Sequence, residues 1–218
     1  MSAPFIHAFL DQTVTQEYID KLEKAIPSTM DDVRYSFAGC KNIDLLRLKR
    51  TTQIKDSRFK EVYLEGPLKE DQIFFDIQHA PEFDIISSNI FHVHSGISTL
   101  VAVGEKSEIK HLELSSYGHI EDSHIEKLTT YYCSIVRVNE NCKIDVLDAT
   151  GGGTIIVQNF DSLNKILLGG GSTIQIITTP DKIKDITEEK LKPMISACRN
   201  IIAEPMVEGP IATLMLHG

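Results

Sequence analysis

The sequence lacks several features that would assign it to a familiar class. Its 218 residues include four cysteines but no C-x-x-C pair, no apolar run of membrane-spanning length and no basic leader before an apolar segment. Disulfide frameworks, membrane spans and secretory leaders carry such signals. We therefore expect a soluble protein of a reducing compartment, cytoplasmic or nuclear.

Positive charge is also scarce. The chain has 31 acidic and 22 basic residues, which gives a formal net charge of -9. A chain with this charge repels both a phosphate backbone and an anionic lipid surface. Neither nucleic acid nor a membrane is expected as a partner, whereas 42% hydrophobic residues suffice for one continuous core.

Signals of catalysis are equally few. There is no G-x-S-x-G elbow, and the triple glycines at 151–153 and 169–171 are followed neither by Lys-Ser/Thr nor by a helical pattern. They fail the phosphate-loop template and are typical of tight turns between strands. We therefore predict no enzymatic activity and no cofactor.

Residues 109–138 predict a strand, a turn, a helix and a second strand. Leu112 and Leu114 lie two apart, as on a half-buried strand, whereas Ile120, Ile125 and Leu128 recur at roughly helical spacing. The same helical spacing returns in 186–201, and further helices are expected to begin near residues 15 and 68. The terminal segment ATLMLHG is expected to close the sheet or cap the stack.

A strand pattern of the form apolar-x-x-apolar-x-apolar recurs through the chain. It occurs at Ile43/Leu46/Leu48, Phe59/Val62/Leu64, Ile109/Leu112/Leu114, Cys133/Val136/Val138 and Leu163/Ile166/Leu168. Shorter strands are predicted for 33–37, for two or three segments between 83 and 103, and for TIIV and TIQII, which follow the two triple glycines.

Helix-to-strand units of this form, with Cys133 and Cys198 near the helix ends, resemble the cysteine-containing leucine-rich repeats often attached to F-box adaptors. The resemblance implies one α/β domain, a repeat-like solenoid with strands on one face and helices on the other. Its units would span roughly 1–66, 67–118, 119–185 and 186–218. It also implies that both cysteines pack structurally, and that the protein is an adaptor or substrate receptor linked to ubiquitin ligation.

The partner surface predicted from this arrangement is the outer face of the strands. Residues between and just after the apolar positions must face solvent. That surface mixes both charge signs with an aromatic ring, which suits a protein partner, and the oligomeric state stays open. The predicted binding residues are Arg47, Tyr63, Glu65, His92, His94, Glu113, Arg137 and Asn139.

An alternative interpretation is a small α/β enzyme or ligand-binding protein that uses the glycine-rich loops or the histidines. His92 and His94 lie two apart on a strand, so both rings face the same side and could offer two nitrogens to a metal. A third ligand would have to come from a neighbouring strand, which the sequence does not identify. An ordinary polar pair on an exposed sheet face is the other interpretation. His119 and His124 would point apart on the predicted helix.

Overall fold

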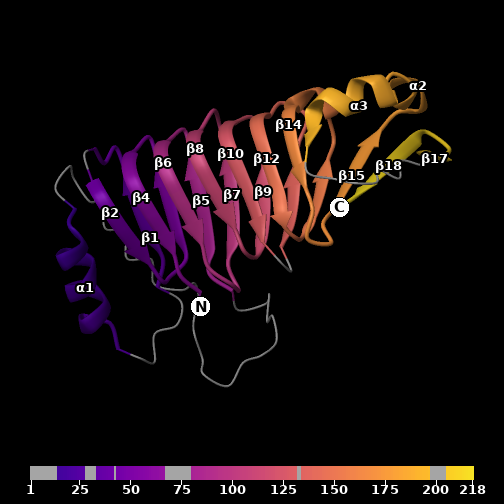
Figure 1. Ribbon diagram of the computed structural model, residues 1–218. Helices are drawn as coiled ribbons and strands as arrows, with labels where there is room; N and C mark the ends of the chain where they lie inside the picture. Colours follow the sequence, from indigo (N-terminus) through magenta and orange to yellow (C-terminus); the bar gives the residue numbers. More distant parts are fainter. Residues whose placement is uncertain (1–13, 28–32, 42, 67–79, 132–133, 197–204) are drawn as a thin grey trace.

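The computed structural model describes residues 14–27, 33–41, 43–66, 80–131, 134–196 and 205–218 (Figure 1). Strands alternate along the chain between two sheets, and consecutive turns stack in parallel. Sheet A has 10 strands in the order β1-β3-β5-β7-β9-β11-β13-β15-β18-β17, and sheet B has 8 in the order β16-β14-β12-β10-β8-β6-β4-β2. The fold is a parallel β-solenoid whose two walls are both sheets.

The strands of the two sheets are short. Sheet A contains β1 Tyr35–Ala38, β3 Thr52–Lys55, β5 Glu82–Ile86, β7 Leu100–Gly104, β9 Tyr117–Ile120, β11 Ile135–Val138, β13 Thr154–Val157, β15 Thr173–Thr178, β17 Pro205–Glu208 and β18 Ile211–His217. Sheet B contains β2 Ile43–Leu48, β4 Arg58–Leu64, β6 Asn89–Ser95, β8 Glu108–Leu114, β10 His124–Tyr131, β12 Lys143–Gly151, β14 Leu163–Leu168 and β16 Ile195–Ser196.

Each turn stacks on the next in a fixed register. Glu108 pairs with Asn89 on the preceding turn and with His124 on the following turn. Parallel pairing therefore brings equivalent positions of successive turns side by side, about 4.8 Å apart. A side chain on one strand consequently meets side chains that lie one turn away in the sequence.

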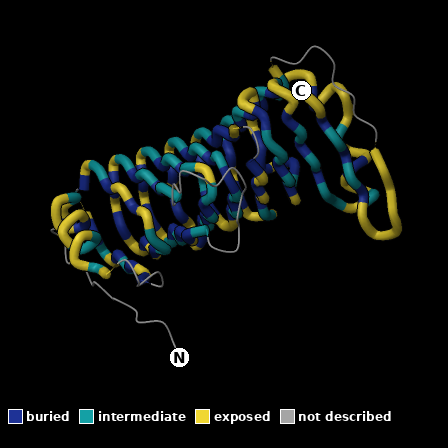
Figure 2. Tube along the Cα trace, turned by 90° about the horizontal axis from the view of Figure 1, so that it is seen from below, coloured by how far each residue is buried: buried dark blue, intermediate teal, exposed yellow. Residues whose placement is uncertain are grey.

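The apolar strand pattern builds the core. In β8 the three apolar residues Ile109, Leu112 and Leu114 are buried, and the residues between them face outward. Figure 2 shows buried and more exposed residues alternating along the stacked turns. The predicted repeat-like solenoid is therefore confirmed in its coarse form.

The helix predicted after Gly118 is wrong. Ile120 ends β9, and Ile125 and Leu128 lie on β10, where all three are buried. The error has a physical origin, because these strands turn two successive residues outward between the first and second buried positions. The resulting three-residue spacing also matches one turn of a helix.

The described helices lie at the two ends of the stack, not along one face (Figure 1). They are α1 Gln16–Ala25, α2 Pro180–Lys184 and α3 Glu188–Met194, with a short 3-10 turn, η2, at Phe160–Ser162. The helix predicted from residue 15 is confirmed as α1. The helix predicted over 186–201 is confirmed only as α3, because Ile195 and Ser196 form the strand β16. The helix predicted from residue 68, like Cys133 and Cys198, falls outside the described residues. None of the described helices is long and apolar enough to cross a membrane.

Helix α1 covers the N-terminal end of the solenoid. Ile19 packs into the core, and Glu23 accepts hydrogen bonds from the Tyr35 hydroxyl at 2.7 Å and from Arg50 Nε at 2.9 Å. The Gln16 side-chain amide accepts a hydrogen bond from the backbone N–H of Arg47 at 2.7 Å and donates one to its carbonyl at 3.4 Å. The outer edge of β2 is thus capped by a side chain.

Stacked serines hold the turns before sheet B together. The hydroxyl of Ser57 accepts from the Cys40 amide at 3.1 Å, that of Ser88 from the Ser57 amide at 3.1 Å, and that of Ser107 from the Ser88 amide at 3.2 Å. Each buried amide therefore finds its acceptor on the next turn. Buried donors need such partners because leaving one unpaired costs about 1–3 kcal/mol.

Both triple glycines form turns between strands, as predicted. Gly152 and Gly153, with φ of 95° and 102°, connect β12 to β13, and Gly170 and Gly171, with φ of 63° and 74°, connect β14 to β15. The chain then ends with β18, which pairs antiparallel with β15 and with β17. The terminal segment therefore joins sheet A, but β17 rather than β18 forms the edge of that sheet.

Candidate functional site

Two rows of side chains run across the outer face of sheet B. The register aligns residues of successive strands, so that each row contains one side chain from each of β2, β4, β6, β8, β10 and β12. The Tyr63 row consists of Arg47, Tyr63, His94, Glu113, Thr129 and Asp148. The His92 row consists of Leu45, Glu61, His92, His111, Lys127 and Val146.

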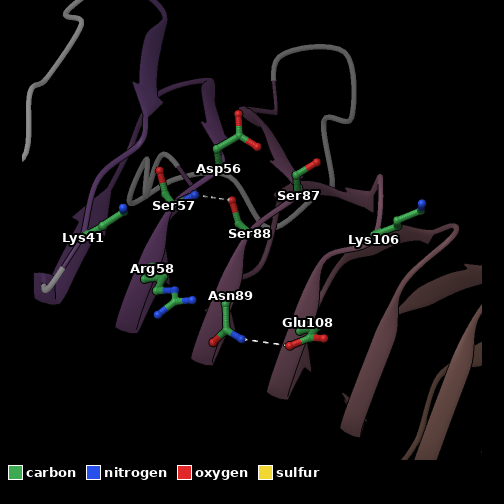
Figure 3. A pocket seen from close by; sticks show the side chains of 9 residues that line it. All are labelled: Lys41, Asp56, Ser57, Arg58, Ser87, Ser88, Asn89, Lys106 and Glu108. Carbon is green, nitrogen blue, oxygen red and sulfur yellow. Dashed lines mark hydrogen bonds between the residues drawn. The ribbon is translucent and has the colours of Figure 1, made fainter.

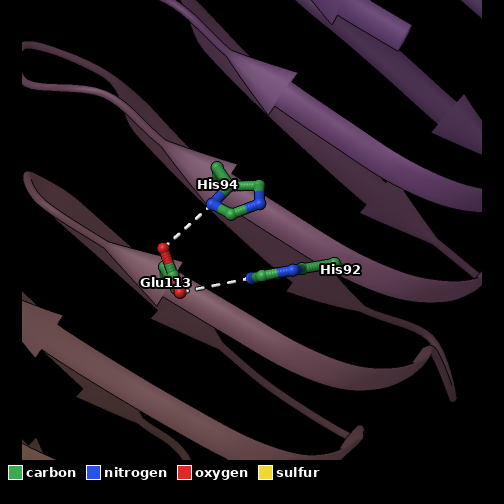
Figure 4. Close-up of side chains that lie close together, drawn as sticks. All are labelled: His92, His94 and Glu113. Atoms are coloured by element: carbon green, nitrogen blue, oxygen red, sulfur yellow. Dashed lines mark hydrogen bonds and ion pairs between the residues drawn. The ribbon is translucent and has the colours of Figure 1, made fainter. Parts of the chain in front are cut away.

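Three side chains converge where the two rows meet β6 and β8. His92 Nε2 lies 3.2 Å from Glu113 Oε1, and His94 Nδ1 lies 2.9 Å from Glu113 Oε2 (Figure 4). One donor atom from each residue lies within 4.8 Å of the other two. We call His92, His94 and Glu113 the histidine cluster.

The cluster is partly recessed in the sheet surface. Its side chains are 21%, 26% and 20% exposed for His92, His94 and Glu113, respectively. His92 Nε2 is buried and, despite its proximity to Glu113, lacks the geometry of a hydrogen bond. Among the described residues, the only other buried side-chain nitrogen or oxygen in this condition is Ser134 Oγ.

Stacked rings fix the orientation of the histidines. Tyr63 stacks on His94 with centroids 4.4 Å apart, His94 contacts His92 at 3.7 Å, and His92 stacks on His111 at 4.4 Å. The Arg47 guanidinium lies 4.6 Å above the Tyr63 ring and closes one end of the stack. Rings confined on both sides lose little further freedom when they bind a ligand.

His111 stands beside the cluster without joining it. Its Nε2 lies 3.0 Å from Thr129 Oγ1 and 3.6 Å from Glu113 Oε1. Burial, and then the neighbouring His92, lowers the pKa of His111 below its ordinary value of 6.5. The ring is therefore neutral at pH 7, and one of its nitrogens is engaged by the threonine hydroxyl.

Glu113 is the anionic centre of the face. Burial acts to raise its pKa, but the contacts with His94 and His92 outweigh burial and hold the pKa below 4.5. Tyr131, at the end of β10, has a pKa raised above 10.0, first by burial and then by the charge of Glu113. At neutral pH the site therefore contains an ionised carboxylate beside a neutral phenol.

Most of the predicted partner surface lies together. Arg47, Tyr63, His92, His94 and Glu113 share the outer face of sheet B. Glu65 follows β4 and lies 3.2 Å from Arg47 Nη1. These six positions agree with the predicted common surface, although binding itself stays a prediction.

Arg137 and Asn139 do not lie on that surface. Arg137 belongs to β11 of sheet A, where its guanidinium lies 6.0 Å from the Tyr117 ring centroid, and Asn139 follows the same strand. Placing them with the sheet B residues was wrong. The segment 133–138 matched the apolar pattern of the sheet B strands, but strands alternate between sheets and β11 belongs to sheet A, where buried and outward residues simply alternate.

His119 and His124 do not form one site either, as expected. His119 lies on β9 of sheet A, 3.5 Å from Glu121, and His124 lies on β10 of sheet B, 2.8 Å from Asp145. The reason differs from the expected one, because the two residues lie on strands of opposite sheets rather than on different faces of a helix.

Sequence reasoning missed His111, Thr129 and Tyr131. The last two lie on β10, which was taken for a helix, so no position opposite β8 was assigned to them. A signal for His111 was present in the sequence. Superimposing the apolar positions of 89–95 on those of 108–114 places His92 opposite His111 and His94 opposite Glu113, as the structure does.

A separate hollow of about 450 Å³ lies at the start of the sheet B strands (Figure 3). Its lining residues are Lys41, Asp56, Ser57, Arg58, Ser87, Ser88, Asn89, Lys106 and Glu108. Both charge signs line it, and Asn89 Nδ2 donates a 3.0 Å hydrogen bond to Glu108. The histidine cluster is nearer the other end of the same strands, so the two features are distinct.

The chemistry of the histidine cluster follows from its donor set. Imidazole nitrogens with a carboxylate oxygen are ligands of zinc and of other divalent first-row transition ions. The scaffold holds them on adjacent strands of a rigid sheet rather than on loops. No family model, curated protein or solved structure matches the chain.

Proposed function

We propose that the protein binds a divalent transition-metal ion, with zinc as the reference case, through His92, His94 and Glu113. The observation that carries this proposal is the convergence of three donor atoms from two adjacent turns. The buried His92 Nε2 supports it, because this nitrogen lies 3.2 Å from Glu113 Oε1 without hydrogen-bond geometry and faces the same carboxylate as His94 Nδ1.

The spacing of the donor atoms suits such an ion. Zinc binds imidazole nitrogen and carboxylate oxygen at about 2.0–2.2 Å, so neighbouring ligand atoms around a tetrahedral ion lie roughly 3.4 Å apart. The two histidine-to-carboxylate separations are 3.2 and 2.9 Å. These contacts are made to different oxygens of Glu113, and the three donor atoms lie within 4.8 Å of one another, so the side chains would draw together to surround one ion.

The ligand types favour transition ions over magnesium and calcium. Magnesium and calcium take oxygen ligands almost exclusively, whereas this site offers two imidazole nitrogens and one carboxylate. The rings are already ordered by the stack from Tyr63 to His111, which reduces the entropy lost on binding.

Metal titration of chelator-treated protein tests the proposal. We expect calorimetry to show one zinc ion per chain, weakened at least 100-fold in His94→Ala. At a free zinc concentration about 100 times Kd, binding would stabilise the fold by roughly 2.7 kcal/mol and raise Tm by about 5–10 °C.

A matched control is available on the same sheet. His124 is a partly exposed histidine paired with Asp145 rather than with the cluster, so His124→Ala should leave zinc affinity unchanged. Equal affinity in wild type, His94→Ala and His92→Ala would show that the zinc lies elsewhere and would overturn the proposal.

A protein-binding role for the outer face of sheet B is a second proposal. It is supported by Phe91, which is 53% exposed, with Lys110 Nζ lying 5.4 Å from its ring centroid, and by Arg47 over Tyr63. Exposed aromatic and arginine side chains frequently dominate interface energies. Tyr63→Ala should weaken a genuine partner by more than about 1 kcal/mol, and an unchanged affinity would place the interface elsewhere. The adaptor role in ubiquitin ligation rests on the repeat resemblance alone.

A further inference from the structure

A second hollow adjoins the one at the start of the sheet B strands. Its volume is about 300 Å³, and it shares Arg58 and Asn89 with the larger hollow, so the two lie side by side. Together they form a continuous recess on the outer face of sheet B. The other residues that line the second hollow are Ile43, Asp44, Phe59, Lys60, Phe91 and Lys110.

The two hollows carry an excess of positive charge. Five basic and three acidic side chains line them, whereas the whole chain has a formal net charge of -9. A local excess of this sign on an acidic chain attracts negatively charged groups. We call the five exposed basic residues the basic surface, and they are Lys41, Arg58, Lys60, Lys106 and Lys110.

Ion pairs do not neutralise the basic surface. Farther along the same face of sheet B, Lys127 lies 3.0 Å from Asp148 and Lys143 lies 3.1 Å from Asp145. In the part of the chain that the structure describes, no residue of the basic surface forms such a pair. Their charges are therefore available to a ligand.

The acidic residues of the two hollows limit the kind of anion that fits. Glu108 accepts a 3.0 Å hydrogen bond from Asn89, and Asp56 points away from Arg58 (Figure 3). A nucleic acid carries a charge at every phosphate and would be repelled by Asp44, Asp56 and Glu108. A peptide can place its carboxylates only where the basic groups lie, so the mixture favours an acidic peptide.

Phe91 gives the basic surface an apolar centre. It is 53% exposed, and the register of β4, β6 and β8 places Lys60 and Lys110 on either side of it, about 4.8 Å away in each direction. In an extended peptide, every second side chain points the same way, and these side chains are about 6.8 Å apart. A peptide that crosses the strands can therefore place an apolar side chain on Phe91 and an acidic one against each lysine, because the long lysine side chains cover the difference.

We infer that the basic surface binds an acidic peptide segment of a partner protein, in which an apolar residue stands between acidic residues at alternate positions. The inference rests on the proposed protein-binding role of the outer face of sheet B and adds the chemistry of the partner. Lys60 and Lys110 bind the two carboxylates, and Phe91 packs against the apolar side chain. Arg58, which lines both hollows, attracts acidic residues farther along the segment.

Fluorescence anisotropy with labelled peptides tests this inference. We expect the peptide Glu-Ser-Phe-Ser-Glu, with a zwitterionic dye at its amino terminus and an amidated carboxyl terminus, to bind saturably. Gln-Ser-Phe-Ser-Gln should bind roughly tenfold more weakly or worse. Equal binding of the two peptides, or no binding of the acidic one, would overturn the inference. An oligothymidylate of equal charge that binds more tightly would assign the surface to nucleic acid and would overturn it as well.

Charge-reversal variants locate the binding. Lys60→Glu and Lys110→Glu should each weaken the acidic peptide about tenfold. Lys165→Glu is the matched control, because Lys165 is exposed on β14 of the same sheet and its reversal changes the net charge equally. Equal losses in all three variants would reveal an effect of net charge alone and would overturn the inference.

The failure of this inference differs from failure of the proposed protein-binding role. Peptide binding that is lost in Tyr63→Ala but kept in Lys60→Glu and Lys110→Glu would leave protein binding on sheet B and refute the basic surface. Circular dichroism checks that each variant is folded, and Lys60→Gln, which should also weaken the peptide, replaces Lys60→Glu if that variant does not fold.

Discussion

Truncation of Leu128 tests the stacking of sheet B most directly. Leu128 is fully buried on β10 and lies beside Leu112 and Leu147 on the two adjacent strands, both also fully buried. Leu128→Ala removes three carbons, which at roughly 0.8 kcal/mol per methylene accounts for about 2.4 kcal/mol. Strands on both sides hold the cavity open, so we expect a total loss of about 3–4 kcal/mol, within the usual 2–5 kcal/mol.

Urea denaturation followed by circular dichroism measures this loss. The midpoint should fall while the slope m stays unchanged, and Tm should drop by roughly 6–16 °C. Glu126→Ala is the matched control, because Glu126 lies two residues earlier on the same strand and is exposed. A loss under about 0.5 kcal/mol for Leu128→Ala would place the residue outside the core.

Further predictions concern charge and turns. Burial alone would raise the pKa of Asp148, but hydrogen bonds from Thr150 and Lys127 hold it below 3.8. As pH falls, the unfolded chain binds this proton before the folded chain does, so the wild type loses stability below about pH 3.8. Asp148→Asn should be about 1 kcal/mol less stable than wild type at pH 7. In thermal melts at a series of pH values, the variant should lose less stability on acidification than the wild type. Gly153→Ala, at φ 102° and facing the preceding turn, should cost more than Gly171→Ala, at φ 74° in open space; equal thermal shifts would contradict the steric reason.

Much of the solenoid could be predicted because its strands carry apolar residues at regularly spaced positions of the sequence. The inward positions of β2, β4, β8 and β14 matched the apolar pattern residue for residue, since each must face the core. The sheet to which each strand belongs was not predicted. The sheet B strands β4, β6 and β8 turn two successive residues outward, whereas the sheet A strands β9, β11 and β13 simply alternate. This difference was not used, because 133–138 matched the longer pattern although β11 lies in sheet A.

The candidate site was likewise predicted only in part. The shared direction of His92 and His94 follows from the two-residue period of a strand and was predicted. The proximity of Glu113 depends on the register between β6 and β8, which the apolar positions of 89–95 and 108–114 define once the two segments are superimposed. Glu113 was therefore expected on the right surface, but its role as the third donor required the register.

The contact between Gln16 and Arg47 has a consequence for assembly. A stack of parallel turns has no intrinsic length, because its last strand offers the same row of amides and carbonyls as every strand inside it. The carboxamide of Gln16 offers the donor and acceptor of a peptide group at that last strand. A second molecule that paired with β2 at Arg47 would first have to displace the Gln16 side chain, so this position of the edge is closed to growth of the stack.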